Sequence, residues 1–175
     1  RSAVEPLADV PEFTNILTMF SNPILGLIAG TVLTAVIQSS SASVGILQAL
    51  CATGSVSFAT ALPIIMGQNI GTCVTAMISS IGAKKNAKRA ALVHLYFNII
   101  GTLVFMIAFY SINAVVHFSF LGHSANAAGI AVIHSVFNIV ATVMLLPFRK
   151  GLVKLACLTM PDSEEDLALA AKDEN

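Results

Sequence analysis

Charge is scarce in this sequence. Only 10% of its 175 residues are Asp, Glu, Lys or Arg, whereas a soluble domain carries about a quarter. The charges are also segregated, because none lies between Glu12 and Lys84 and none between Arg89 and Arg149. With 56% hydrophobic residues and a mean hydropathy of +0.85, uncharged stretches of this length indicate an integral membrane protein.

Cysteine is also rare, and the net charge is zero. Cys51, Cys73 and Cys157 form no CxxC pair, and the first two lie in apolar segments. We therefore interpret those two as small buried hydrophobic residues rather than disulfide or metal ligands. Because the sequence has no basic stripe, it gives no support for nucleic acid as a partner. No signal peptide precedes Arg1, which leaves open that the chain is a fragment of a longer protein.

A polar cluster interrupts the first long apolar stretch. It consists of Gln38, Ser39, Ser40, Ser41 and Ser43. The 14 apolar-rich residues 24–37 before it would reach about 21 Å as a helix, short of the roughly 30 Å hydrocarbon core. We therefore predict a re-entrant helical hairpin over residues 24–53 with the polar cluster at its tip; the alternative is one long helix that carries the cluster through the membrane.

A second interruption, "GQNIGT" at residues 67–72, separates two apolar pieces of half length. Pro63, Gly67 and Gly71 each weaken a continuous helix. We predict a broken transmembrane helix over residues 56–83 that unwinds near the depth of the hairpin tip. Polar groups inside a membrane are costly and usually functional. The second set of candidate site residues is therefore Gly67, Gln68, Asn69, Gly71 and Thr72.

Two further transmembrane helices are expected over residues 90–118 and 127–148, both free of charge. The basic cluster "KKNAKR" at residues 84–89 indicates that this loop lies on the cytoplasmic side of the membrane. These segments give one hairpin plus three crossings, so the N-terminus is expected outside and the C-terminus in the cytoplasm. The expected fold is an all-α integral membrane protein.

The odd number of crossings means that a second copy in one chain would have inverted topology. Residues 22–160 are therefore expected to form one inverted-repeat unit of a secondary transporter. Residues 1–21 are predicted to form an amphipathic helix in the membrane interface, and residues 161–175 an acidic cytoplasmic tail or linker.

A short motif occurs twice, as "HLYFNIIGT" at residues 94–102 and "HSVFNIVAT" at residues 134–142. Its His, Asn and Thr are spaced four residues apart, so they share one helical face. They either line an ion path or form hydrogen bonds between adjacent helices, and the second interpretation is favoured because lone polar residues often join membrane helices. The residues concerned are His94, Asn98, Thr102, His134 and Asn138.

The two interruptions together predict an anion site with a coupled cation. New half-helices would begin near Ala42 and Cys73, and helix N-termini attract anions. The preceding half-helices would end near Ile37 and Met66, where free carbonyl groups suit Na⁺. Because no Arg or Lys lies in either interruption, anion binding would depend on the co-bound cation, as coupled transport requires.

"QSSSAS", then "PIIMGQNIGTCVTA", a basic loop and "HLYFN" together resemble the sodium-dependent phosphate cotransporter family (type II and its bacterial relatives), across residues 22–148. The resemblance implies sodium-coupled symport of inorganic phosphate across the cell membrane, with no enzymatic activity and no cofactor besides Na⁺ as coupling ion. It also implies two inverted QSSS repeats, of which this chain is the second. The first repeat, in the same full-length chain or a second copy, would then be a partner.

The resemblance further implies which residues bind the solutes. Phosphate and Na⁺ would lie between residues 38–41 and the opposite pair Asn69 and Thr72. The Na⁺ would lie near Gln38, Ser39, Asn69 and Thr72.

Three other functions are compatible with parts of the pattern. The first is a transporter of another oxyanion, such as a dicarboxylate or sulfate, because hydroxyl groups and helix N-termini discriminate poorly among oxyanions. The second is an intramembrane serine hydrolase with a serine of residues 39–43 as nucleophile and His94 or His134 as base, although no GxSxG elbow is present. The third is a membrane scaffold whose serines only pack helices.

Overall fold

The computed structural model describes residues 19–162, and the regular elements in this part of the chain are helices. The prediction of an all-α membrane protein is confirmed, because three helical units are long and apolar enough to cross a membrane. The interfacial helix expected over residues 1–21 and the tail at 161–175 lie almost wholly outside the described residues. The elements are α2 (Pro23–Ile37), α3 (Ser40–Cys51), α4 (Phe58–Ser79), α5 (Lys85–Val116), η2 (Ser119–Gly122), α6 (Ala127–Leu145), η3 (Leu146–Phe148) and α7 (Arg149–Thr159).

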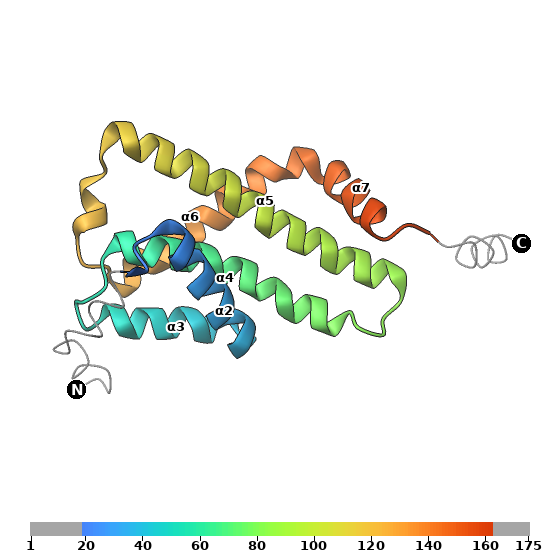
Figure 1. Cartoon of the computed structure of the whole chain (residues 1–175), viewed down its shortest axis with the longest axis horizontal. Helices are drawn as coiled ribbons and strands as arrows, with labels where there is room; N and C mark the ends of the chain where they lie inside the picture. The colour runs from blue at the N-terminus through green and yellow to red at the C-terminus, as the bar shows by residue number, and fades with distance from the viewer. Residues whose placement is uncertain (1–18, 163–175) are drawn as a thin grey trace, which may run out of the picture.

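The spanning units α4, α5 and α6–α7 run alternately between two ends of the molecule (Figure 1). At one end, which we call the η2 end, the α3–α4 connection lies beside the α5–α6 connection. There the Phe58 amide donates to the His123 carbonyl at 3.0 Å, and the Ala125 amide donates to the Val56 carbonyl at 2.7 Å. At the other end, the Arg89 end, the Arg89 side chain contacts Met160 just after α7.

Helices α2 and α4 make the most extensive helix contact in the described part of the chain, and glycine makes it possible. A Cβ atom on Gly71 would lie 2.6 Å from the Thr31 carbonyl oxygen, and one on Gly67 would collide with the Leu27 carbonyl. On α2, a Cβ atom on Gly30 would collide with the backbone of α4 in the same way. Small residues of this kind let two membrane helices approach backbone to backbone.

The polar cluster at residues 38–41 ends α2 and starts α3. Gln38 adopts the left-handed conformation, with φ 56°, and its amide donates to the Thr34 carbonyl as the helix ends. Ser39 is extended, and its side chain accepts from the Ala42 amide at 3.3 Å as the N-cap of α3. Serine is a preferred N-cap residue, so the sequence itself dictates the change of direction. The result is two short helices joined at Gln38–Ser39.

The predicted break in the helix over residues 56–83 is wrong. α4 is one α-helix from Phe58 to Ser79, with Pro63 inside it. Pro63 removes one hydrogen bond near the start of the helix, and close packing on α2 compensates for the low helix propensity of Gly67 and Gly71. The helix end expected near Met66 and the helix start expected near Cys73 therefore do not exist.

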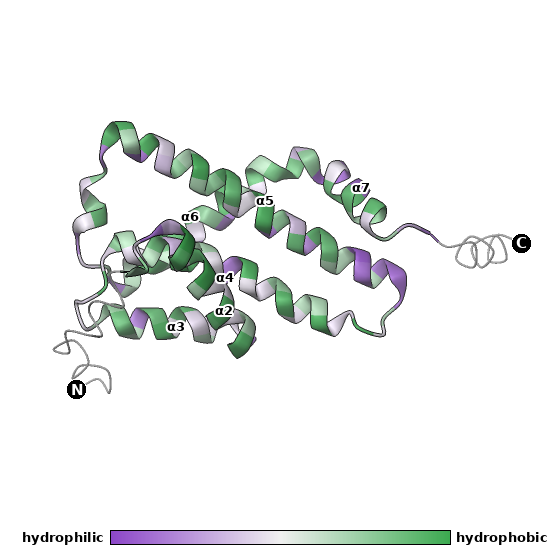
Figure 2. Ribbon diagram, viewed as in Figure 1, coloured by the Kyte–Doolittle hydropathy of each residue, from purple (hydrophilic) through white to green (hydrophobic). Residues whose placement is uncertain are grey.

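Hydrophobic residues make up most of α5 and α6 (Figure 2), and many of them are exposed. Ile107, Val132 and Val143 are each at least 60% exposed. Such a surface suits a lipid environment or another hydrophobic partner. Inside, aromatic rings join the helices, for example Phe105 and Phe137 with centroids 5.3 Å apart.

Candidate substrate-binding site

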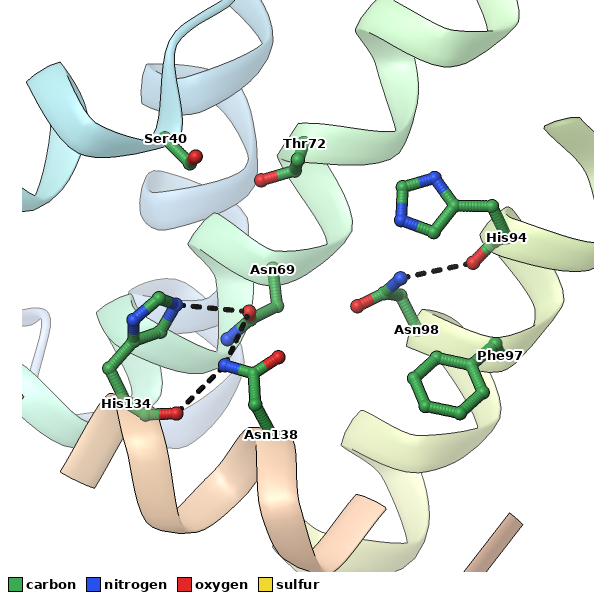
Figure 3. Close-up of a pocket in the computed structure, with 8 residues that line it drawn as sticks. All are labelled: Ser40, Asn69, Thr72, His94, Phe97, Asn98, His134 and Asn138. Carbon is green, nitrogen blue, oxygen red and sulfur yellow. Dashed lines mark hydrogen bonds between the residues drawn. The ribbon is translucent and has the colours of Figure 1, made fainter. Parts of the chain in front are cut away.

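A cavity of about 310 Å³ lies where α3, α4, α5 and α6 meet (Figure 3). Seven of its eight lining residues are polar and none is Asp, Glu, Lys or Arg. They are Ser40, Asn69, Thr72, His94, Phe97, Asn98, His134 and Asn138. The cavity is thus a polar site without carboxylate, lysine or arginine side chains, set among helices of largely apolar composition.

Asn69 on α4 lines this cavity and forms hydrogen bonds on both sides of its amide group. Its Oδ1 atom is 3.2 Å from His134 Nε2 and accepts from Asn138 Nδ2 at 3.4 Å. Its own Nδ2 donates to the Ile65 carbonyl at 3.0 Å. Because both ends of the buried Asn69 amide are bonded, α4 and α6 are held in one fixed relation across the cavity.

The repeated motif produces the same local geometry on α5 and α6. Asn98 Nδ2 donates to the His94 carbonyl at 3.0 Å, and Asn138 Nδ2 donates to the His134 carbonyl at 2.8 Å. These bonds orient both side chains, so that the amide oxygens of Asn98 and Asn138 point into the space between the helices (Figure 3).

The interhelical hydrogen bonding that the sequence favoured is present at His134 and Asn138, and four of the motif residues line the cavity. The contacts of His134 and Asn138 with Asn69 are interhelical hydrogen bonds, and these residues, with His94 and Asn98, also line the cavity. Thr102 does not line the cavity, and its buried hydroxyl has no hydrogen-bond partner among the described residues.

From the serine cluster, only Ser40 lines the cavity. Its hydroxyl group at the start of α3 and that of Thr72 on α4 point toward one another (Figure 3). Thr72 also donates to the Gln68 carbonyl at 2.9 Å. The side chains of Gln38 and Ser41 are exposed at the tip of the α2–α3 pair, and Ser39 caps α3.

Ser43 and Gln68 lie outside the cavity, in the contact between α2, α3 and α4. The buried Ser43 hydroxyl accepts from Thr34 Oγ1 at 2.7 Å and from Gln68 Nε2 at 2.9 Å. Gln68 Oε1 is buried without a partner among the described residues. Gly67 and Gly71 contact α2 rather than the cavity. These four candidates thus hold the helices on which the lining residues lie.

Sequence reasoning missed two residues of this region. Phe97 lines the cavity, and Thr34 bonds the Ser43 hydroxyl. The signal for Phe97 was its place between His94 and Asn98 in the repeated motif; Thr34 carried no distinct signal among the other apolar and hydroxyl residues of α2.

The geometry gives little support for a hydrolase. Such an enzyme needs a contact between its serine nucleophile and a histidine base. His134 Nε2 is near Asn69 instead, and no serine of residues 39–43 is bonded to a histidine. No group of three His, Cys, Asp or Glu in the described part of the chain could hold a metal ion. The oxygen atoms available to a cation are neutral amides and hydroxyls of Ser40, Thr72, Asn98 and Asn138.

Three spanning helical units around an uncharged polar cavity define a polytopic membrane protein with a polar site between its helices. The chain belongs to the Na⁺/Pi-cotransporter family, whose model matches residues 5–135. This confirms the resemblance found in the sequence.

Among similar proteins, uncharacterized protein YqeW of Bacillus subtilis (strain 168) is 40% identical over 75 residues, which are 43% of this chain and 24% of that protein. Sodium-dependent phosphate transport protein 2B of Homo sapiens is 37% identical over 101 residues, which are 54% of this chain and 15% of that protein. Sodium-dependent phosphate transport protein 2A of Rattus norvegicus is 39% identical over 94 residues, which are 50% of this chain and 15% of that protein. The chain thus spans a quarter or less of these relatives. No solved structure matches it.

Proposed function

We propose that this chain forms one half of a sodium-coupled symporter of inorganic phosphate, and that the cavity is part of the substrate site. The observation that carries the proposal is the uncharged polar cavity at the start of α3, lined from four helices. The family membership and the names of the mammalian relatives support phosphate and Na⁺ as the transported solutes.

The anion would bind at the start of α3. The first amide groups of a helix have no partner inside it, and they carry a partial positive charge. Ser40 lies at the first position of α3, and the Thr72 hydroxyl faces it. Amide and hydroxyl donors converging on one space suit an oxyanion such as phosphate.

The Na⁺ would bind close to the anion. The last carbonyl groups of α2, ending at Ile37, have no partner within the helix. The amide oxygens of Asn98 and Asn138 supply further neutral ligands. Because no lining residue carries a fixed charge, the anion and the cation would each provide the charge that the other needs. Each would then raise the affinity of the other by the same factor.

The α2–α3 pair would act as a re-entrant hairpin. α2 starts near Pro63, close to the η2 end, and α3 ends at that same end. Thr34, four residues before the tip, packs on Gly71, which lies roughly 20 Å along α4 at 1.5 Å per residue. The tip would therefore stop inside the membrane, which is tolerated where it faces protein or a cavity.

The other half of the transporter would complete the site. The exposed side chains of Gln38 and Ser41 at the tip would meet a second QSSS segment from an inverted repeat, in the same full-length chain or a second copy. In this arrangement the η2 end faces outside and the basic residues 84–89 face the cytoplasm.

The test is radiolabelled phosphate uptake into proteoliposomes that contain the full-length protein, with and without a Na⁺ gradient. Ser40→Ala and Thr72→Val should each weaken phosphate affinity about tenfold or more, because a hydrogen bond to a charged group contributes roughly 1.5–3 kcal/mol. Ser111→Ala, on an exposed part of α5, is the matched control. Wild-type uptake by both folded site variants would contradict the proposed site.

The same assay separates phosphate from other oxyanions. Unlabelled sulfate and a dicarboxylate are added as competitors at equal concentration. We expect phosphate to compete best. Stronger competition by sulfate or the dicarboxylate would reassign the substrate while keeping the site.

A further inference from the structure

Helix α7 follows the last apolar helix at a bend that the sequence "LPF" of η3 produces. α6 has 19 residues, or about 28 Å, which nearly equals the thickness of the hydrocarbon core. If α6 alone crosses the hydrocarbon core, α7 would begin at the membrane boundary on the Arg89 side. Leu152 and Ala156 are buried in the molecule, whereas Arg149, Lys150 and Lys154 are exposed. None of these three cations forms an ion pair in residues 19–162.

An apolar groove of about 450 Å³ lies at the bend, between α5, the end of α6 and α7. Gly151 forms part of its wall, and a Cβ atom there would meet no other atom within 4 Å. The groove is thus open at the one position of α7 that has no side chain. Its lining includes Ile100, Val104, Met144, Phe148, Gly151 and Leu155.

The cations lie beside this groove on the same helix. Lys154 is three residues after Gly151, so the two lie about 60° apart around α7. Lys150 is one turn before Lys154, on the same side. A lysine side chain is long enough to lay its apolar stem along such a surface and hold its ammonium group at the water boundary. Exposed positive charge and the apolar groove are therefore neighbours on α7, and in this placement both lie at the membrane face.

We propose that this groove binds an anionic phospholipid, with an acyl chain between α5 and α7 and the headgroup phosphate on Lys150 and Lys154. The charge complementarity selects the occupant, because exposed cations at a membrane surface attract anionic lipids. A free anion would use the cations and leave the groove empty, and a neutral lipid would use only the groove. The site is separate from the polar cavity and does not depend on the proposed transport function.

The experiment measures lipid retention by the full-length protein. The protein is reconstituted with equal amounts of phosphatidylglycerol and phosphatidylcholine that carry the same acyl chains, then extracted, and the bound lipids are counted by native mass spectrometry. The wild type should retain phosphatidylglycerol preferentially. The double variant Lys150→Gln/Lys154→Gln should retain about fivefold less of it.

Two further variants make the test specific. Gly151→Leu places a side chain in the groove without altering charge, and it should lower phosphatidylglycerol retention to a similar degree. Replacing glycine by leucine also favours the helix. If the lysine variant fails to fold, phosphatidylglycerol retention by Gly151→Leu therefore tests whether the groove binds the lipid. Lys84→Gln/Lys88→Gln removes two cations from the same side of the membrane, and it should retain the lipid as the wild type does.

Three outcomes would overturn the proposal. They are equal retention of both lipids by the wild type, full retention by Gly151→Leu, and an equal loss in the Lys84→Gln/Lys88→Gln control. The last result would mean that overall positive charge, rather than the α7 groove, attracts the lipid.

Discussion

Ser43 shows how one hydroxyl group can hold three helices. It lies on α3, is fully buried, and accepts hydrogen bonds from Thr34 of α2 and Gln68 of α4. Both donors are buried as well, so neither can turn to water if the acceptor is lost. A buried polar group without a partner is costly.

Ser43→Ala should therefore lower stability without touching the cavity. The loss of the shared acceptor is expected to cost about 1–3 kcal/mol, seen as a lower midpoint of thermal unfolding of the full-length protein in detergent. The matched control is Ser41→Ala at an exposed position, where a change within about 0.5 kcal/mol is expected. Equal midpoints for the two variants would show that the bonds of Ser43 contribute nothing.

The sequence predicts the serine cluster as a polar interruption, but it does not predict which serine lines the cavity, which one caps α3 and which one packs between helices. The sequence pattern marks residues 38–43 as a polar interruption. Only when α3 is known to begin at Ser40 does helical spacing put Ser40, Ser43 and Leu47 on one inward face and Ser41 on another. The position of the N-cap, rather than composition, decides which serine reaches the cavity and which one packs.

At the scale of helices, the glycines of α2 and α4 act as contact surfaces. Gly26 and Gly30 on α2 are four residues apart, as are Gly67 and Gly71 on α4. This is the small-xxx-small spacing that brings membrane helices together. Helix propensity alone predicts that Gly67 and Gly71 break the helix, because it carries no information about a neighbouring backbone. The matching spacing on α2 was the signal that favours close packing.

Gly67→Ala should separate α2 from α4. Its Cβ atom would collide with the Leu27 carbonyl, which belongs to backbone and cannot rotate away. The expected cost is about 1–3 kcal/mol, measured as a lower unfolding midpoint. Gly45→Ala, where a Cβ atom meets nothing within 4 Å, should instead be neutral or stabilise α3 by up to about 1 kcal/mol. If both variants shift the midpoint alike, the α2–α4 contact is less close than described.

A second element-level contact holds the end of α7 on α5. Arg89 donates through Nε and Nη2 to the Met160 carbonyl, at 3.0 Å and 2.7 Å, and pairs with Asp162 at 2.9 Å. Near this point the Tyr96 and Thr159 hydroxyls are 2.7 Å apart. An arginine that satisfies a carbonyl just beyond a helix end stabilises its last turn.

Arg89→Gln should loosen this last turn. We expect amide hydrogen exchange at residues 156–160 to become about tenfold faster, which corresponds to roughly 1.4 kcal/mol of lost local stability. Exchange in α4 should not change, since α4 does not contact the Arg89 side chain through any hydrogen bond. Lys88→Gln is the control for charge. Unchanged exchange at residues 156–160 in Arg89→Gln would contradict the role of Arg89.

For the whole molecule, the question is how the α2–α3 pair lies in the membrane. α4, α5 and α6–α7 join the two ends of the molecule in alternation, and the α3–α4 and α5–α6 connections meet at the η2 end. A re-entrant hairpin requires that the chain before α2 reach this same end. If α2 and α3 instead crossed as one helix, residues on either side of the pair would lie on opposite faces of the membrane.

Single cysteines distinguish these two topologies. In a background with Cys51, Cys73 and Cys157 replaced, Met19→Cys and Ala52→Cys flank the α2–α3 pair, and both positions are exposed. Ser119→Cys marks the η2 end and Asn86→Cys the Arg89 end, also at exposed positions.

Intact cells that express the full-length variants are treated with a membrane-impermeant maleimide. Positions 19, 52 and 119 should react, and position 86 should react only after the membrane is permeabilised, because the basic residues around it favour the cytoplasm. Reaction at 86 with protection at the other three would keep the hairpin but invert the orientation. Reaction at only one of positions 19 and 52 would rule out the re-entrant hairpin, because the two ends of a hairpin that enters and leaves one face cannot be separated by the bilayer.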